Sequence, residues 1–359
     1  LANLIGNINA GGGGVNRNAL INGSFNVAQR GTSVTDIGVD DYGLDRWKQY
    51  ASLGGMTGRS THSQETITDL EGFTKALKIA VTTTETPASN ESYALVQRIE
   101  AQDSIRFGVG TSNAKPLALS FYAKANASIT LPAGLRMQGG GIYLNNFNIT
   151  TSWQRFSLSI PAVTDTNMAT TSTGTDMGAE VFITLMANAD IQTASTETWT
   201  DTANLGASGM GNLYASTSNF LFVTGVQLEI GQNPTEFEHE PFATTLLKCQ
   251  RYFYREVDDD SSAFHWVGFC DNTTQAYIQH PHPIKMRGEP SMTATGTAGD
   301  YSLRITGNTV GLNQVPSLSN SHKRVGHVLW QCASGLTAGQ AIVGKFDAAD
   351  VFLDWSAEL

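Results

Sequence analysis

The chain has 359 residues, of which 40% are hydrophobic, 15% are charged and 36 are glycine, and its formal net charge is -10. This composition indicates a folded protein of short strands and tight turns, and it excludes nucleic acid as a partner because no cationic stripe is present to neutralise phosphates. No apolar run approaches the roughly 18 residues of a membrane span, which excludes membrane insertion.

Residues 1–15 contain the run GGGG and could not form a core. We interpret them as a glycine-rich tether to whatever precedes them in a longer chain. They have neither the basic start nor the apolar stretch of a secretory signal peptide.

Residues 16–240 contain short runs that alternate apolar and polar side chains, the pattern of half-buried strands. Turn-rich segments such as QGGG and TSTGTDMG separate the runs, with no helical pattern between them. The pattern predicts a jelly-roll β-sandwich in an all-β protein. The apolar positions of the clearest runs are Leu77, Ile79 and Val81; Leu117, Leu119, Phe121 and Ala123; Phe156, Leu158 and Ile160; Val181, Ile183 and Leu185; and, on one face of the longest run, Phe220, Phe222, Val226, Leu228 and Ile230.

Residues 241–255 interrupt the strand pattern. Pro241 suits the first turn of a helix, and Phe242, Leu246, Cys249 and Phe253 fall on one helical face. We predict a short helical joint here, although the run RYFYREV fits a strand equally well. Alternating runs resume in residues 256–359, for which we predict a smaller, sandwich-like C-terminal β domain.

The three cysteines, Cys249, Cys270 and Cys332, are too few and too far apart for a disulfide framework or a zinc finger. We expect them to be small buried hydrophobic side chains.

Several segments together resemble a known family. They are LINGSFNVAQRGTSV (20–34), YGLDRWKQY (42–50), LSFYAKA (119–125), TSWQRFSLSIP (151–161), GVQLEIGQNPTEFEHEPFATTLLKCQRYFYRE (225–256), PIKMRGEPSMTATG (283–296) and FDAADVFLDWSAEL (346–359). In this order they are similar to the distal region of bacteriophage tail fibre proteins, in which a jelly roll like a carbohydrate-binding module precedes a small β domain.

The resemblance implies a virion structural protein of the tail fibre. It implies a homotrimer that contacts other tail proteins and binds polysaccharide on the host cell surface, by adhesion and without catalysis. Two alternatives stay open: a capsid fibre or decoration protein with the same adhesive domains, and a polysaccharide-cleaving enzyme with an unrecognised pair of carboxylates. The chain lacks the regular repeat of a parallel β-helix, which weighs against the enzyme.

Exposed aromatic rings are the side chains on which sugars stack. Trp47, Trp153, Trp330 and Trp355 lie in strand-like runs, so we expect them in cores. The candidates for glycan contact are Trp199 and Trp266, which lie in or beside polar segments, followed by Tyr143, Tyr214 and Tyr277. For Trp199, a buried or intersubunit role stays open as the alternative.

Two histidines have the spacing of metal ligands. His280 and His282 lie two residues apart in QHPHP, so on an extended segment both point the same way, and in a trimer they could hold iron on the threefold axis. The alternative is a surface proline loop. The acidic segments 38–45 and 256–262 could supply oxygen ligands to a structural calcium, with solvated acidic turns as the alternative. No cofactor is otherwise expected.

Overall fold

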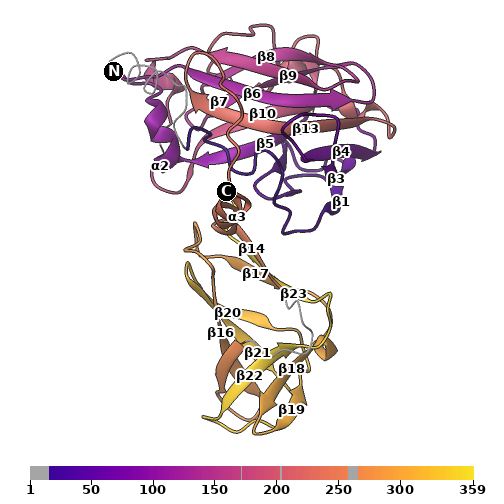
Figure 1. Cartoon of the computed structure of the whole chain (residues 1–359), viewed down its shortest axis with the longest axis vertical. Helices are drawn as coiled ribbons and strands as arrows, with labels where there is room; N and C mark the ends of the chain where they lie inside the picture. The colour runs from indigo at the N-terminus through magenta and orange to yellow at the C-terminus, as the bar shows by residue number, and fades with distance from the viewer. Residues whose placement is uncertain (1–15, 171, 203, 258–265) are drawn as a thin grey trace. The chain divides into compact units, whose positions relative to one another are not determined.

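The computed structural model describes residues 16–170, 172–202, 204–257 and 266–359, so the predicted tether lies outside the described residues. Strands dominate, and the described part of the chain contains two short α-helices, α2 (Ala101–Ser104) and α3 (Phe242–Gln250) (Figure 1). The prediction of an all-β protein is confirmed. Neither helix has the length and apolar character of a membrane span. The chain divides into an N-terminal unit, Leu1–Thr245 with Leu359, and a C-terminal unit, Leu246–Glu358.

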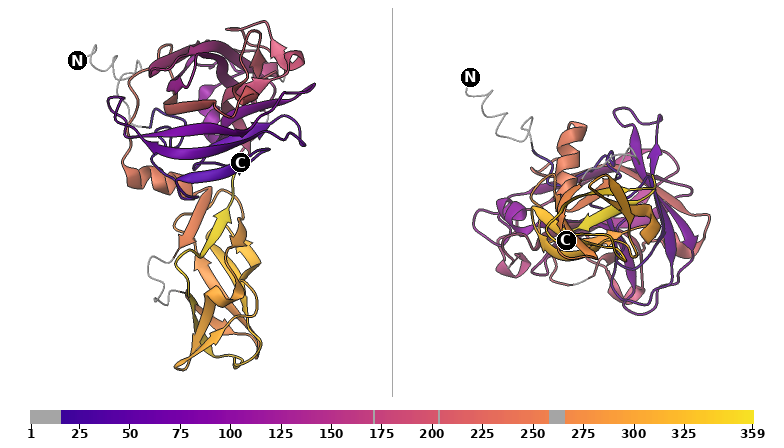
Figure 2. Two further views of the ribbon diagram at one scale, coloured as in Figure 1. Left: turned by 90° about the vertical axis from the view of Figure 1, so that its right-hand side faces the viewer. Right: turned by 90° about the horizontal axis from the view of Figure 1, so that it is seen from below.

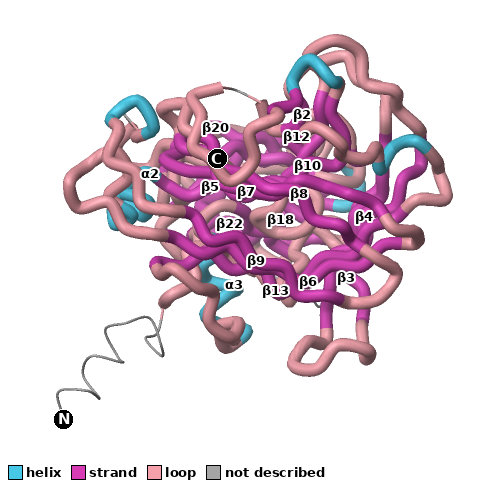
Figure 3. The backbone as a smooth tube through the Cα atoms, turned by 90° about the horizontal axis from the view of Figure 1, so that it is seen from above, coloured by secondary structure: helices cyan, strands magenta, loops and turns pink. Residues whose placement is uncertain are grey.

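The N-terminal unit is a sandwich of two antiparallel sheets, visible as layers in Figure 2 and from above in Figure 3. Strands from β4 onward cross repeatedly between the sheets, as in a jelly roll. The six-stranded sheet has the order β1 (Ser33–Ile37), β3 (Arg59–Thr66), β4 (Lys75–Thr83), β13 (Phe220–Ile230), β6 (Leu117–Ala125), β9 (Gln154–Ile160). The five-stranded sheet has the order β2 (Lys48–Ala51), β5 (Ser92–Glu100), β10 (Met177–Ala187), β7 (Ile129–Met137), β8 (Ile142–Ile149).

The inner faces of the two sheets form one hydrophobic core. The predicted apolar positions of β4, β6 and β10 all lie in it, and so does Trp47, which is fully buried against Phe25. Alternation along these strands therefore identified the inner faces correctly, because each strand is buried on one side of a pleated sheet.

Strand β13 carries a β-bulge that changes which side chains face the core. The pairing of β13 with β6 shifts register between Thr224 and Gln227. Gly225, inside the bulge, has a φ of 61°. A Cβ atom at this position would lie 2.7 Å from the ring of Phe73. The bulge therefore requires glycine, both for its left-handed backbone and for the close ring.

The bulge overturns one predicted strand face. Leu221 and Val223 are fully buried in the core together with Val226, although Val226 follows Val223 by three positions and strict alternation would place it on the opposite face. Phe220 and Phe222 lie on the other side of the strand, partly exposed on the outer face of the six-stranded sheet. The prediction that both phenylalanines share a face with Val226 is wrong, because the extra residue of the bulge inverts the alternation.

The outer face of the five-stranded sheet is largely occupied by the chain itself. Leu205 and Ala207 pack on Phe182 and neighbouring apolar side chains of that face. The hydroxyl of Thr184 donates to the carbonyl of Leu205 at 2.6 Å. Glu180, at 0% exposure, forms salt bridges with Arg98 and Arg136 of the two adjacent strands. On the outer face of the six-stranded sheet, by contrast, Phe220 and Phe222 stay partly exposed.

The C-terminal unit has a three-stranded sheet, in the order β14 (Phe253–Val257), β23 (Phe352–Ser356), β17 (Ser291–Ala294). Its seven-stranded sheet has the order β19 (Asn308–Gly311), β18 (Tyr301–Ile305), β22 (Ala341–Phe346), β15 (Trp266–Cys270), β16 (Gln275–Pro281), β21 (Val325–Gln331), β20 (Ser317–His322). Both contribute to one core, in which Trp330 and Trp355 are fully buried as predicted. Cys249, Cys270 and Cys332 are free and buried, which confirms that expectation.

Helix α3 is shorter than the predicted joint. It ends at Gln250, and Phe253 begins strand β14, so the strand alternative for RYFYREV is the one observed. On the helix, Cys249 is buried while Phe242 is 57% exposed, so Phe242 does not belong to a buried face. Arg255 pairs with Asp354 at 2.7 Å and lies over the ring of Phe352.

We expect Gly326→Ala to destabilise the C-terminal unit by about 1–3 kcal/mol, the usual cost of overpacking a core. A Cβ atom at Gly326 would lie 2.1 Å from the buried indole ring of Trp355. The control is Gly311→Ala, in strand β19, where no heavy atom lies within 4 Å of the added Cβ. Urea unfolding of both variants tests this, and an equal effect of the two would contradict the close packing at Gly326.

Candidate functional site

Three of the predicted aromatic contacts are core side chains. Trp266, Tyr143 and Tyr214 are 7%, 5% and 0% exposed. Trp266 donates its indole N–H to the carboxylate of Glu256, and the hydroxyl of Tyr214 lies 3.0 Å from Ser60 Oγ. The prediction that these rings contact glycan is wrong, since a polar neighbourhood in the sequence does not report burial in the fold.

Trp199 and Tyr277 are partly exposed. The indole N–H of Trp199 donates to the carbonyl of Pro161 at 2.9 Å, and its ring packs on Tyr143. Trp199 is thus held in place by the fold while part of its ring stays exposed, and its contact with glycan stays a prediction. Tyr277 lies on the outer face of the seven-stranded sheet beside Phe269, which is 52% exposed. Phe269 and Tyr277 form a pair of partly exposed rings on the C-terminal unit.

His280 and His282 lie inside the C-terminal unit, at 0% and 8% exposure. Their segment is strand β16 up to Pro281, and the Nδ1 atom of His280 lies 2.9 Å from Glu256. Both imidazoles pack on Trp355. Neither the axial iron site nor the surface proline loop is compatible with this burial. Their spacing did predict correctly that both rings point the same way.

The acidic segments do not gather into a metal site in the described part of the chain. No group of three or more His, Cys, Asp or Glu side chains there could hold a metal ion. Asp40 pairs with Lys48 at 3.1 Å, and buried Asp45 accepts a bond from the backbone of Gln29. Residues 258–262 of the second segment lie outside the described residues.

The outer face of the six-stranded sheet carries a row of rings that alternates with lysines. Trp153 and Phe222 have ring centroids 6.1 Å apart, and Phe222 and Phe220 5.6 Å apart. Lys124 Nζ lies 4.8 Å from the Trp153 ring and 5.2 Å from the Phe222 ring. Lys78 Nζ lies 5.0 Å from the Phe220 ring and 5.6 Å from the Phe222 ring. We call these five residues the ring–lysine row.

Strand register explains this arrangement. Phe222 of β13 pairs with Lys78 of β4 on one side and with Lys124 of β6 on the other. Trp153 directly precedes β9, the strand beyond β6. Side chains directly opposite on adjacent strands lie side by side on one face, so the three central members meet by register alone.

The two lysines differ in their electrostatic environment. Lys124 forms a salt bridge with Asp69, which also accepts the indole N–H of Trp153 at 2.9 Å. The hydrogen bonds from Lys124 and Trp153 hold the pKa of Asp69 below its usual range. Lys78 has no salt bridge to a carboxylate in the part of the chain that the structure describes.

A small hydrophobic cluster supports the row from one side. Phe73, buried on the same outer face, packs on the rings of Tyr122 and Phe237 at 5.2 Å each. Asp69 belongs to the segment between β3 and β4 that leads into Phe73. The cluster therefore fixes the loop that brings Asp69 to Lys124.

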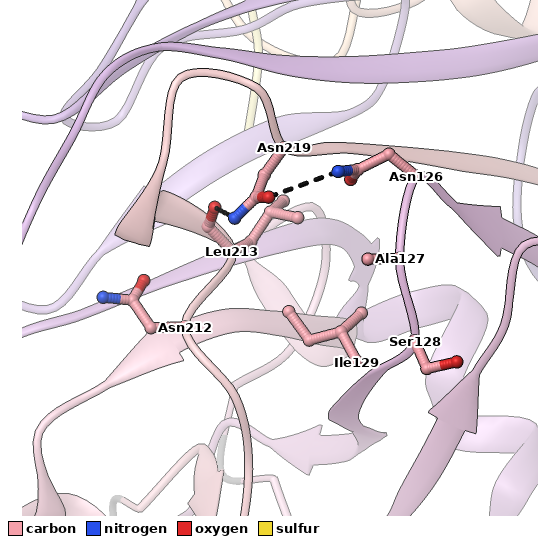
Figure 4. Close-up of a pocket in the computed structure, with 7 residues that line it drawn as sticks. All are labelled: Asn126, Ala127, Ser128, Ile129, Asn212, Leu213 and Asn219. Carbon is pink, nitrogen blue, oxygen red and sulfur yellow. Dashed lines mark hydrogen bonds between the residues drawn. The ribbon is translucent and has the colours of Figure 1, made fainter.

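A pocket of about 230 Å³ lies at the end of the sandwich where β13 begins (Figure 4). Its amide groups are used by the fold: Asn126 bonds to Asn219 at 3.3 Å, and Asn212 donates to the carbonyl of Glu85. Asn126 also accepts the backbone N–H of Phe220, the last ring of the row. These hydrogen bonds tie together the two loops that line the pocket beside the row.

This surface is suited to holding a polar molecule with apolar faces, such as a saccharide. Rings offer stacking area, while lysine and carboxylate groups offer hydrogen bonds of both directions. No signal in the sequence pattern alone places Phe220 and Phe222 outside the core, because the bulge is hidden. The glycine within β13 was the available clue, since glycine inside a strand pattern often marks a bulge.

Comparison with known proteins gave structural neighbours alone. No protein-family model matches the chain, and no curated protein sequence matches it. The chain is similar to a family 4 carbohydrate-binding module, with 10% identity and a TM-score of 0.29 over 58% of this chain and 97% of that one. It is similar to the cellulose-binding domain of a Cellulomonas fimi β-1,4-glucanase, with 16% identity and a TM-score of 0.28 over 59% and 97%.

A further neighbour is the enzymatically active domain of tailspike protein 4 of bacteriophage CBA120, with 13% identity and a TM-score of 0.29. The similarity covers 60% of this chain and 21% of the tailspike chain. At these values the assignment of the fold rests on the strand pairing described above.

Proposed function

We propose that this chain is the receptor-binding part of a phage tail fibre, which adheres to polysaccharide on the host cell surface and does not cleave it. The observation that carries the proposal is the ring–lysine row on the open face of the six-stranded sheet. The resemblance of the sequence to tail fibre proteins supplies the virion context, including a homotrimer attached to other tail proteins.

The row binds by stacking and hydrogen bonding. The apolar faces of sugar rings pack on Trp153 and Phe222, while Lys124 and Asp69 bond to hydroxyl groups at the edges of the sugar. One such site is shallow and weak. In a trimer, three sites engage one polysaccharide surface, and the later contacts are intramolecular, which raises the overall affinity.

We expect Trp153→Ala to weaken binding of the chain to host polysaccharide about tenfold or more, because truncating an aromatic anchor typically costs about 2 kcal/mol. Calorimetry with polysaccharide extracted from host cells measures this. The matched control is Phe269→Ala, which removes an exposed ring on the C-terminal unit. Loss of binding in Phe269→Ala but not in Trp153→Ala would move the site to the C-terminal unit and contradict the proposal.

Adhesion without cleavage has its own test. Polysaccharide incubated with the chain keeps its length and gains no reducing ends if the proposal is correct. Shortened polysaccharide would show an enzyme. Gold-labelled antibodies against the chain should mark the tail tip of intact virions, and labelling of the head would contradict the tail assignment.

A further inference from the structure

Lys78 is the lysine of the ring–lysine row that has no carboxylate partner among the described residues. Its ammonium group lies 5.0 and 5.6 Å from the ring centroids of Phe220 and Phe222, a geometry that favours a cation. It forms no salt bridge within the described residues. All three ammonium protons can be donated to a ligand.

The other lysine of the row, Lys124, has the carboxylate partner that Lys78 lacks. Lys124 holds the equivalent place on the opposite side of Phe222, and there Asp69 supplies a carboxylate. The two lysines thus flank one ring, and only the Lys124 side carries an internal anion among the described residues. Near Lys78, the acidic neighbour on β3 is Glu65, and its carboxylate accepts the hydroxyl of Ser63 at 2.7 Å.

We infer that the glycan bound by the row is acidic, and that a carboxylate of one of its sugar residues pairs with Lys78. The inference rests on the proposed function and names the class of polysaccharide: one that contains uronic acid or another carboxylated sugar. The sugar ring stacks on Phe222 and Phe220, and its carboxylate takes at Lys78 the place that Asp69 takes at Lys124.

The net charge of the whole chain does not favour an acidic polysaccharide, so attraction to it has to come from the immediate surroundings of Lys78. With a net charge of -10, the protein repels a polyanion at long range, and screening over about 8 Å at physiological salt limits that repulsion. A specific, short-range pair at Lys78 is therefore required for an acidic polysaccharide to bind. We expect added salt to weaken binding far less than it weakens binding by a cationic protein.

The test compares the host polysaccharide before and after chemical reduction of its carboxylates to alcohols. We expect the unmodified chain to bind the native form about tenfold more tightly than the reduced form. Lys78→Gln should bind the native form about tenfold more weakly than the unmodified chain, and should no longer distinguish the two forms. Lys78→Arg should restore the preference. Lys115→Gln, which removes an exposed lysine of the same unit, should behave like the unmodified chain.

The outcomes separate the inference from the proposed function. If the unmodified chain binds both forms equally, or if the bound polysaccharide contains no carboxylate, the inference is wrong while adhesion stands. If Lys78→Gln keeps the full preference for the native form, the carboxylate is recognised elsewhere and Lys78 is not its partner. If the chain binds no host polysaccharide at all, the proposed function itself fails.

Discussion

Glu256→Ala is expected to destabilise the C-terminal unit by about 3–5 kcal/mol, the usual cost of breaking a buried charged network. The carboxylate, 5% exposed, accepts the indole N–H groups of Trp266 and Trp355 at 2.5 and 3.0 Å and lies 2.9 Å from Nδ1 of His280. Burial raises the pKa of Glu256, but the hydrogen bonds from His280 and the two indoles outweigh burial, and the pKa lies below its usual range.

The size of the effect follows from the donors that remain. Removing the carboxylate leaves two buried indole N–H groups without an acceptor, and each such group costs about 1–3 kcal/mol. Urea unfolding measures the loss. Glu289→Ala, on the exposed surface of the same unit, is the control and should change stability by less than about 0.5 kcal/mol. Equal effects of the two substitutions would show that the network contributes nothing to stability.

Acid is expected to destabilise the N-terminal unit through His62. The imidazole is fully buried, and burial lowers its pKa from 6.5 to about 3. Between these two values the unfolded state binds a proton that the folded state does not, so stability falls as pH falls from 6.5 toward 3. At pH 5 the loss from this one group is about 2 kcal/mol, since each pKa unit corresponds to about 1.4 kcal/mol.

The pH dependence of a variant isolates this contribution from that of the carboxylates. His62→Leu removes the titrating group. Between pH 7 and pH 5, the free energy of unfolding of the unmodified chain should fall by about 2 kcal/mol more than that of the variant. His239→Gln, which changes an exposed histidine, should keep the original dependence. Parallel curves for the unmodified chain and His62→Leu would contradict the buried, neutral state of His62.

The sequence predicted the buried face of a strand correctly wherever apolar and polar side chains alternate without interruption. Alternation placed Leu77, Leu119 and Ile183 in the core, because a strand in a sandwich buries one face. It failed at Phe220 and Phe222, because the bulge at Gly225 adds a residue that the apolar pattern does not reveal. Gly225 is a clue that a bulge is present, but the side chains that it turns to the other face follow only from the pairing with β6.

The sequence predicted the kind of side chain at the candidate site, exposed aromatic rings, but not which residues form it. Sequence reasoning sought exposed rings in polar loops and found Trp199 and Trp266, yet the fold buries Trp266 and ties Trp199 to Pro161. The rings that stay partly exposed lie on strand β13, as Phe220 and Phe222 do, or directly before β9, as Trp153 does, and Trp153 was expected in the core. Which strands are neighbours in a sheet depends on contacts far apart in the sequence, and that pairing brings Lys78, Phe222 and Lys124 together.

The most direct test of glycan binding by the ring–lysine row is ¹⁹F NMR of the chain labelled with 5-fluorotryptophan. The six tryptophans give six signals, each assigned by a Trp→Phe variant. On titration with host polysaccharide, we expect the signal of Trp153 to shift and those of buried Trp47, Trp330 and Trp355 to stay in place. A saturable shift of another tryptophan while the Trp153 signal does not move would contradict the account.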